Sequence, residues 1–164
     1  MGCPFSTETG SVKVITQCGK FTRIQEPGFG FILCPCIGYE LVAGTLSLRV
    51  QQLDVHCTTK TRDNVFVEVK VTVQYQVEPG SEKDAFFKLT HPEDQIKAYV
   101  YDALRAEVPK ETLDKLFLVK DDLSNAIKTT LQSAMKKFGF MILSTTGRQF
   151  IFLTFTLFLM FFTN

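Results

Sequence analysis

The chain has 164 residues, a formal net charge of +1 and 45% hydrophobic residues. This length allows one domain of ordinary size with its own apolar core, and the balanced charge argues against nucleic-acid binding. Charge is unevenly placed, because no Asp or Glu follows Asp122. The C-terminal end is therefore a different kind of segment from the rest of the chain.

The first six residues fit the M-G-x-x-x-[ST] pattern for N-myristoylation, with Gly2 as the acceptor. One myristoyl chain gives only marginal membrane binding, about 10⁴ M⁻¹, so stable attachment needs a second signal. A palmitoyl thioester on Cys3 would supply that signal. The alternative is a disordered start with an incidental cysteine. We expect lipidation at Gly2 and Cys3.

Residues 1–20 contain no basic start followed by an apolar run, which is the pattern of a secretory signal. We therefore expect the chain to stay in the cytosolic compartment, where thiols are reduced. Cys34 and Cys36 suggest a metal site, but zinc needs about four ligands, and the only histidines are His56 and His91. We expect neither a metal nor another cofactor.

Residues 27–38 are apolar but interrupted by Gly and Pro, and the run is too short to span a bilayer. Two structures fit this pattern: a buried loop under a sheet, or a wedge that dips into the membrane interface. In the second case Cys34 and Cys36 would be further acylation sites. The wedge would bring four side chains into contact with the membrane: Phe29, Phe31, Ile32 and Leu33.

Residues 65–77 place Val or Tyr at every second position. Because a strand turns alternate side chains to opposite faces, this pattern predicts one long, half-buried strand. The run that begins at residue 45 has the same character, and the polar segment 60–64 joins the two. We predict two long antiparallel strands connected by a turn.

The part of the chain after residue 77 has the patterns of helices. A turn at residues 78–81 precedes a short helix over residues 82–89. Pro92 suits the first position of the next helix, which ends at Pro109. Strands followed by helices predict an α+β fold in which helices cover one face of an antiparallel or mixed sheet.

Two further helices and a returning strand are expected near the C-terminus. Thr112 can cap a short helix over residues 113–117. The last helix has acids in its first turn and ends at Gly139, which suits a left-handed position, and residues 140–143 form the strand. Its apolar stripe packs on the sheet, or in part against a neighbouring subunit, and comprises Leu123, Ile127, Leu131, Met135 and Phe138.

Four short motifs stand in a characteristic order: LRVQQLDV at residues 48–55, TKTRDNVFV at 59–67, DAFFKL at 84–89 and QIKAYVYD at 95–102. Together they resemble the band 7 (SPFH) domain of the stomatin–prohibitin superfamily, nearest to its plant hypersensitive-induced response branch. The resemblance implies long antiparallel strands followed by helices on one face of the sheet. It also implies Met-Gly starts with nearby cysteines, and a membrane-facing segment at residues 27–38.

Three parts of the chain follow from this resemblance. We expect a lipidated N-terminal segment at residues 1–11, a band 7 domain at 12–143 and an apolar tail outside the family pattern at 144–164. Members of this type continue with a long charged helix that supports ring or cage assembly, and this chain lacks it. The apolar run 150–162 fits a membrane anchor, a strand completing the sheet, or a non-native ending from a truncated or alternatively spliced transcript, which we favour.

The resemblance implies a non-catalytic, lipid-anchored, self-associating scaffold of membrane microdomains at the cytosolic face of the plasma membrane, involved in plant hypersensitive cell death and defence signalling. Its partners would be membrane lipids, band 7 relatives and immune receptors or ion channels. An alternative is a truncated regulatory binding module that caps or interferes with full-length assemblies. The sequence has no Gly-rich phosphate loop, nucleophile elbow or HExxH motif, so we expect no catalytic residue.

Overall fold

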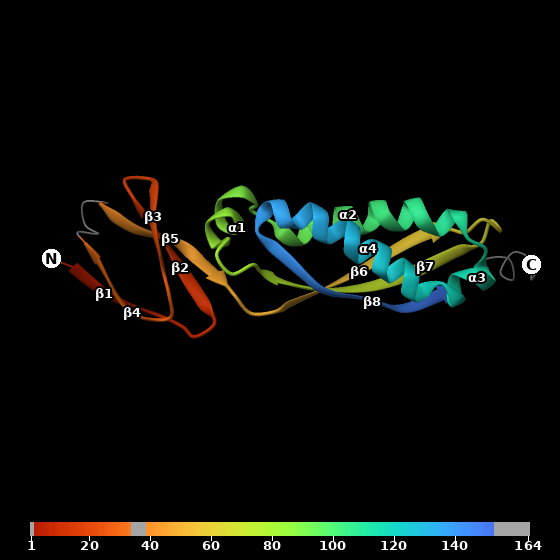
Figure 1. The fold of residues 1–164 in the computed structure, drawn as a ribbon, viewed down its shortest axis with the longest axis horizontal. Helices are drawn as coiled ribbons and strands as arrows, with labels where there is room; N and C mark the ends of the chain where they lie inside the picture. The colour runs from red at the N-terminus through yellow and green to blue at the C-terminus, as the bar shows by residue number, and fades with distance from the viewer. Residues whose placement is uncertain (1, 34–38, 153–164) are drawn as a thin grey trace, which may run out of the picture. The chain divides into compact units, whose positions relative to one another are not determined.

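The computed structural model describes residues 2–33 and 39–152, and Figure 1 traces the chain from its N-terminus to its C-terminus. These residues form two compact units, each assembled from segments that are distant in the sequence. The first unit consists of residues 2–33, 39–51, 76–90 and 136–141. The second consists of residues 52–75, 91–135 and 142–152.

Two small antiparallel sheets make up most of the first unit. One pairs β1 (Gly2–Thr7) with β4 (Gly28–Leu33). The other has the order β3–β2–β5 and consists of β2 (Ser11–Gln17), β3 (Lys20–Gln25) and β5 (Glu40–Ser47). Val14 and Ile15 of the central strand are fully buried. Most of the sequence before residue 48 therefore forms strands, although no alternating pattern predicted them.

A short helix, α1 (Glu82–Lys88), packs on the three-stranded sheet of this unit. The Phe86 ring lies against Gly44 of β5, so closely that a Cβ atom at Gly44 would come within 2.8 Å of it. The Phe87 ring meets Phe21 of β3 edge to face, with ring centroids 5.9 Å apart. The predicted helix over residues 82–89 is thus confirmed, and its two phenylalanines attach it to the sheet.

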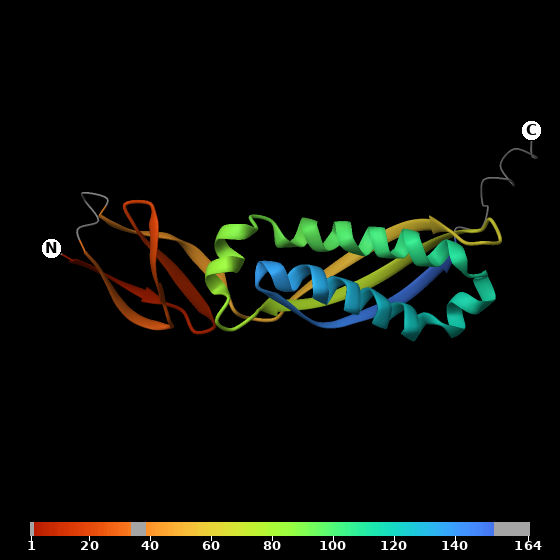
Figure 2. The same cartoon turned by 45° about the horizontal axis from the view of Figure 1, so that its top comes forward.

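The second unit consists of one sheet covered by helices. The sheet has the order β6–β7–β8, and α2 and α4 lie side by side over one of its faces (Figures 1 and 2). The predicted α+β architecture of long antiparallel strands with helices on one face is confirmed. Its elements are β6 (Gln51–Lys60), β7 (Phe66–Val77), α2 (Pro92–Glu107), the 3₁₀ turn η2 (Val108–Lys110), α3 (Leu113–Leu118), α4 (Lys120–Met135) and β8 (Phe140–Phe152).

The core of the second unit follows the predicted periodicities. Every second residue of β7 from Val67 to Tyr75 is buried, and so is every fourth residue of α4 from Ile127 to Met135. Leu123, the first residue of the predicted stripe, is only half-buried. The strand before β7 is shorter than predicted, because β5 ends at Ser47 and a break at residues 48–50 precedes β6.

A carboxylate from the β6–β7 turn caps α3. Thr112 occupies the residue before the helix, as predicted, but its side chain makes no capping hydrogen bond. The backbone N–H of Leu113 instead donates to Oδ2 of Asp63, over 3.0 Å. The backbone N–H of Arg62 donates to the carbonyl of Glu111 beside it, over 3.1 Å. The predicted capping role of Thr112 was wrong, because an aspartate fifty residues away in sequence reaches the same helix end.

Gly139 ends the helical part of the chain, after the 3₁₀ turn η3 (Lys136–Phe138). Its φ of +79° lies in the left-handed region, which confirms the predicted helix-terminating conformation. The backbone also passes close to α1, since a Cβ atom at Gly139 would lie 2.7 Å from the carbonyl oxygen of Ser81. The chain then enters β8, which includes residues 150–152 of the apolar run; the remainder, 153–164, lies outside the described residues.

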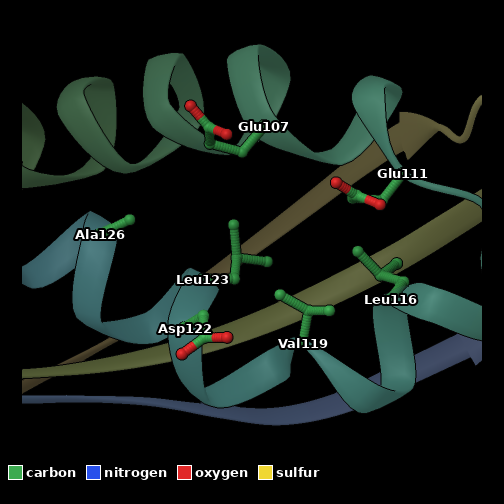
Figure 3. A pocket seen from close by; sticks show the side chains of 7 residues that line it. All are labelled: Glu107, Glu111, Leu116, Val119, Asp122, Leu123 and Ala126. Carbon is green, nitrogen blue, oxygen red and sulfur yellow. The ribbon is translucent and has the colours of Figure 1, made fainter.

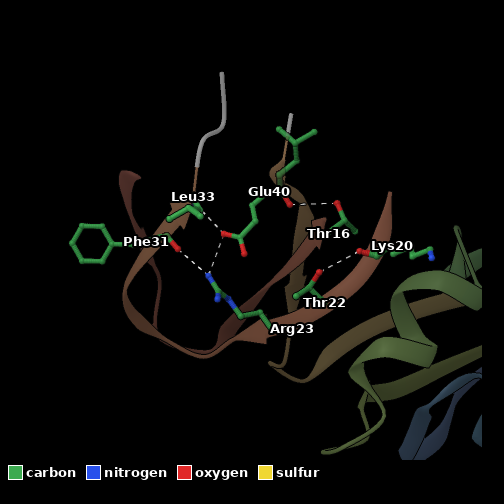
Figure 4. Close-up of polar contacts among 8 residues, drawn as sticks. Thr16, Lys20, Thr22, Arg23, Phe31, Leu33 and Glu40 are labelled. Carbon is green, nitrogen blue, oxygen red and sulfur yellow. Dashed lines mark hydrogen bonds and ion pairs between the residues drawn. The ribbon is translucent and has the colours of Figure 1, made fainter. Parts of the chain in front are cut away.

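An ion pair within the three-stranded sheet also binds the backbone of the two-stranded sheet (Figure 4). Oε2 of Glu40, on β5, accepts the backbone N–H of Leu33 at 2.9 Å and lies 3.5 Å from Nη2 of Arg23. The same Nη2, on β3, donates to the carbonyl of Phe31 at 2.9 Å. The side chain of Glu40 is 11% exposed and that of Arg23 46% exposed. Strands β3 and β5 of the three-stranded sheet thus each supply one side chain that binds the backbone of β4.

We predict that Asp63→Ala lowers the free energy of unfolding by about 0.5–2 kcal/mol, because Leu113 loses the acceptor of its N–H group. Thr112→Ala is the matched control and should cost less, since the Thr112 side chain makes no capping bond. Urea denaturation followed by circular dichroism measures both changes. A larger loss in Thr112→Ala than in Asp63→Ala would refute the capping assignment.

We predict that Glu40→Ala lowers the free energy of unfolding by about 1.5–3 kcal/mol, because the Leu33 N–H group loses a charged acceptor. Glu40→Gln keeps an acceptor oxygen and should lose less. Glu26→Ala removes an exposed carboxylate elsewhere in the same unit and serves as the control. In thermal unfolding, the melting temperature should fall most in Glu40→Ala, less in Glu40→Gln and least in Glu26→Ala. Equal melting temperatures for Glu40→Ala and Glu26→Ala would contradict the role given to Glu40.

Candidate membrane-contact surface

Strand β4 exposes three large apolar side chains, which we call the apolar ridge: Phe29, Phe31 and Leu33. They are 65%, 60% and 58% exposed, respectively. The two rings contact each other edge to face, with centroids 4.9 Å apart. Because they occupy alternate positions of one strand, all three side chains lie on the same face of the β1–β4 sheet. Because contiguous exposed apolar patches are typical of interaction sites, the ridge is the candidate contact surface of this unit.

The opposite face of β4 carries no aromatic side chain and is closely packed against β1. Gly30 lies opposite Phe5 of β1, and a Cβ atom at Gly30 would come within 2.7 Å of the Phe5 ring. Ile32 is only 8% exposed and also lies on this inner face. The alternation of glycine and phenylalanine therefore sends every aromatic side chain of β4 outward. The Phe5 ring needs the space that a glycine leaves.

The two predicted lipidation residues lie on the strand that pairs with the ridge. In the antiparallel register, Gly2 lies opposite Leu33 and Cys3 lies opposite Ile32. Residues directly opposite each other share a face, so Gly2 lies on the ridge face and Cys3 on the other. Cys3 is nevertheless exposed. Acyl chains on these two residues would start at the N-terminal end of β1, the one on Gly2 on the ridge face and the one on Cys3 on the opposite face.

The cysteines differ in their accessibility to acylation or oxidation. Cys3 and Cys18 are exposed, whereas Cys57 is buried in the second unit. Burial raises the pKa of the Cys57 thiol, and the nearby Arg105 guanidinium opposes this effect. A buried thiol that stays protonated is a poor nucleophile. Of these three, only Cys3 combines accessibility with a position next to Gly2. Two more cysteines lie outside the described residues: Cys34 and Cys36.

Most of the predicted contact residues come together on one strand. Of the two structures considered for residues 27–38, a buried loop does not fit residues 28–33, because they form a strand with an exposed apolar face. We leave Ile32 out of the proposed contact surface, since its side chain faces inward. Sequence reasoning missed Arg23 and Glu40, which hold the ridge in place. Single charged residues in strands without an alternating apolar pattern are not distinguishable in the sequence from ordinary surface residues, so nothing could have identified these two.

Neither a metal site nor a membrane-spanning helix is present among the residues that the structure describes. In the part of the chain that the structure describes, no three His, Cys, Asp or Glu side chains lie close enough to hold a metal ion. His56 is exposed and its Nδ1 lies 3.4 Å from Oε1 of Glu68, while the adjacent Cys57 points into the core. Among the described residues, no helix is both long and apolar enough to cross a bilayer.

Comparison with known proteins agrees with the architecture. The model of the SPFH domain / Band 7 family matches residues 5–148. Hypersensitive-induced response protein 4 of Arabidopsis thaliana is 43% identical over 135 residues, which are 82% of this chain and 46% of that protein. Protein HflK of Buchnera aphidicola subsp. Baizongia pistaciae is 29% identical over 76% of this chain and 29% of its own length.

A further relative is the modulator of FtsH protease HflK from Escherichia coli K12, 25% identical over 73% of this chain and 28% of its own length. The chain thus spans less than half the length of these relatives. The family model nevertheless covers most of the chain, including both units and the strand that bears the apolar ridge. The chain belongs to the SPFH domain / Band 7 family.

Proposed function

We propose that this protein is a non-catalytic scaffold of membrane microdomains, held at the cytosolic face of the plasma membrane by acyl chains on Gly2 and Cys3. The observation that carries the proposal is the apolar ridge on β4, next to the strand that bears both acceptors. The first unit would present this ridge to the bilayer, and self-association would concentrate the protein there. By its likeness to the Arabidopsis relative, the scaffold would serve in hypersensitive cell death and defence signalling.

The energetics of the ridge support this role. Full transfer of one such side chain out of water contributes about 1.5–3 kcal/mol, although the ridge residues already have part of their surface buried. A single myristoyl chain binds membranes only marginally. Three apolar side chains beside the acyl chains therefore add a contribution of the size that stable attachment needs. They would also fix the orientation of the first unit on the surface.

Attachment to a membrane would favour self-association without strong contacts. Chains confined to one surface meet at high effective concentration, so weak interfaces become occupied. Immune receptors or ion channels would be recruited to the same patch. These partners remain part of the proposal, and so does self-association with band 7 relatives.

A second candidate function is a regulatory binding module that caps or interferes with longer band 7 assemblies. It is favoured by the name of the E. coli relative, which is a modulator of a protease. Such a module would act through a surface that recognises another protein. The anchored scaffold remains the first proposal because the ridge and the acceptor residues lie on paired strands.

We predict that Gly2→Ala/Cys3→Ser moves the protein from the membrane fraction to the soluble fraction, because both acyl acceptors are lost. Cys3→Ser alone should retain weak, salt-resistant membrane binding through the single myristoyl chain. Fractionation of cells that express each variant, with intact mass spectrometry of the recovered chain, measures both outcomes. The mass also reports directly which acyl groups are present.

Cys18→Ser is the matched control, because Cys18 is exposed but lies on the turn between β2 and β3. It should fractionate as the wild type does. A double variant that still sediments with membranes would refute the anchor. Fractionation of the same double variant without residues 153–164 then tests the C-terminal run. Release of that shortened variant into the soluble fraction would show that the C-terminal run holds the protein, which would also contradict the proposal.

A further inference from the structure

The second unit contains a groove between the end of α2 and the start of α4 (Figure 3). Its volume is about 190 Å³. One wall is the C-terminal end of α2 with the segment that follows η2, and the other is α3 and the first turns of α4. Because all these residues belong to one unit, the groove is a property of that unit alone.

The floor of the groove is apolar. Leu116 is buried, Val119 and Leu123 are half-buried, and Ala126 is exposed beside them. Leu123 belongs to the predicted apolar stripe of α4 and is one of its half-buried residues. Part of the apolar stripe therefore faces a solvent-accessible groove, where it can receive an apolar side chain from another molecule.

Three carboxylates stand around this floor: Glu107, Glu111 and Asp122. Figure 3 shows the apolar side chains lying between Glu107 and Glu111 of one wall and Asp122 of the other. Glu107 is paired with Lys110, whose Nζ lies 2.8 Å from Oε1. Among the described residues, Glu111 and Asp122 make no ion pair. Carboxylates beside a low-dielectric floor make a negative field that attracts cations.

The size and charge of the groove restrict what can occupy it. Pockets for small molecules have volumes of about 300–1,000 Å³, so this groove is small for such a ligand. It suits one apolar anchor side chain of a protein partner. The cytosolic leaflet is negatively charged and would be repelled by the acidic rim, which argues against a lipid surface here.

We propose that this groove docks an amphipathic helical segment of another protein, with a Leu, Ile or Phe side chain on the floor and Lys or Arg residues against the rim. Recognition of this kind combines the apolar face of a helix with charges at its edges. The basic residues give specificity and a faster encounter, and the apolar anchor gives most of the affinity. The inference goes beyond the membrane role, which belongs to the first unit.

The test uses the full chain and a short amidated helical peptide of leucine and lysine, with fluorescence anisotropy as the readout. Glu111→Gln/Asp122→Asn should weaken binding by about three- to tenfold, because two exposed ion pairs are lost. Ala126→Leu should weaken it by about tenfold, because the new side chain occupies the floor. Raising the salt concentration should weaken wild-type binding. A peptide with glutamate in place of lysine should not bind.

Matched controls are Glu93→Gln/Asp102→Asn, which removes two exposed carboxylates from α2 away from the groove, and Ala98→Leu on the exposed side of the same helix. Both should bind as the wild type does, and circular dichroism should show all variants folded. Equal affinities for groove variants and controls, or equal binding of both peptides, would overturn the proposal. Sedimentation of the same samples gives a further test. If the groove variants abolish self-association, the occupant of the groove is a second copy of the chain, and the proposal of another protein is overturned.

Discussion

The proposed membrane surface depends on one contact, the hydrogen bond that the backbone N–H of Leu33 donates to the carboxylate of Glu40. A two-stranded sheet such as β1–β4 is marginal in water by itself. Glu40 and Arg23 bind the backbone of β4 at Leu33 and Phe31, so they hold the strand without covering its outer face. The inner face is filled by Phe5 over Gly30. The three side chains of the apolar ridge are consequently left in solvent by an arrangement that fixes their position.

The two units present surfaces of opposite character. The first carries an apolar ridge on the strand that pairs with the two proposed acyl acceptors, and the second carries a small apolar groove with an acidic rim. An anionic bilayer suits the first surface and is repelled by the second. A band 7 domain built in this way can hold a membrane with one unit and leave the other available to proteins. Neither surface requires chemistry from the chain, which accords with a scaffold.

The sequence predicted the elements whose patterns are strong and local. Alternation in β7 and four-residue spacing in α4 come from residues that pack directly on the core, so the second unit was largely predictable. The cap of α3 was not, because Asp63 is close to Leu113 only after the sheet and helices assemble. Strand β4 was obscured by its glycines, which usually indicate turns. Glu40 and Arg23 carried no signal, because their partners are backbone groups of another strand.

The most direct test of the membrane surface uses the absence of tryptophan from this chain. Phe31→Trp in the acylated protein places a single tryptophan on the ridge, which can be excited selectively over the tyrosines. On vesicles of phosphatidylcholine and phosphatidylserine, its emission should shift to shorter wavelength, and brominated acyl chains should quench it. Phe66→Trp, at a similarly exposed position in the second unit, should respond to neither. A Phe31→Trp emission that stays unchanged on vesicles that bind the protein would contradict the account.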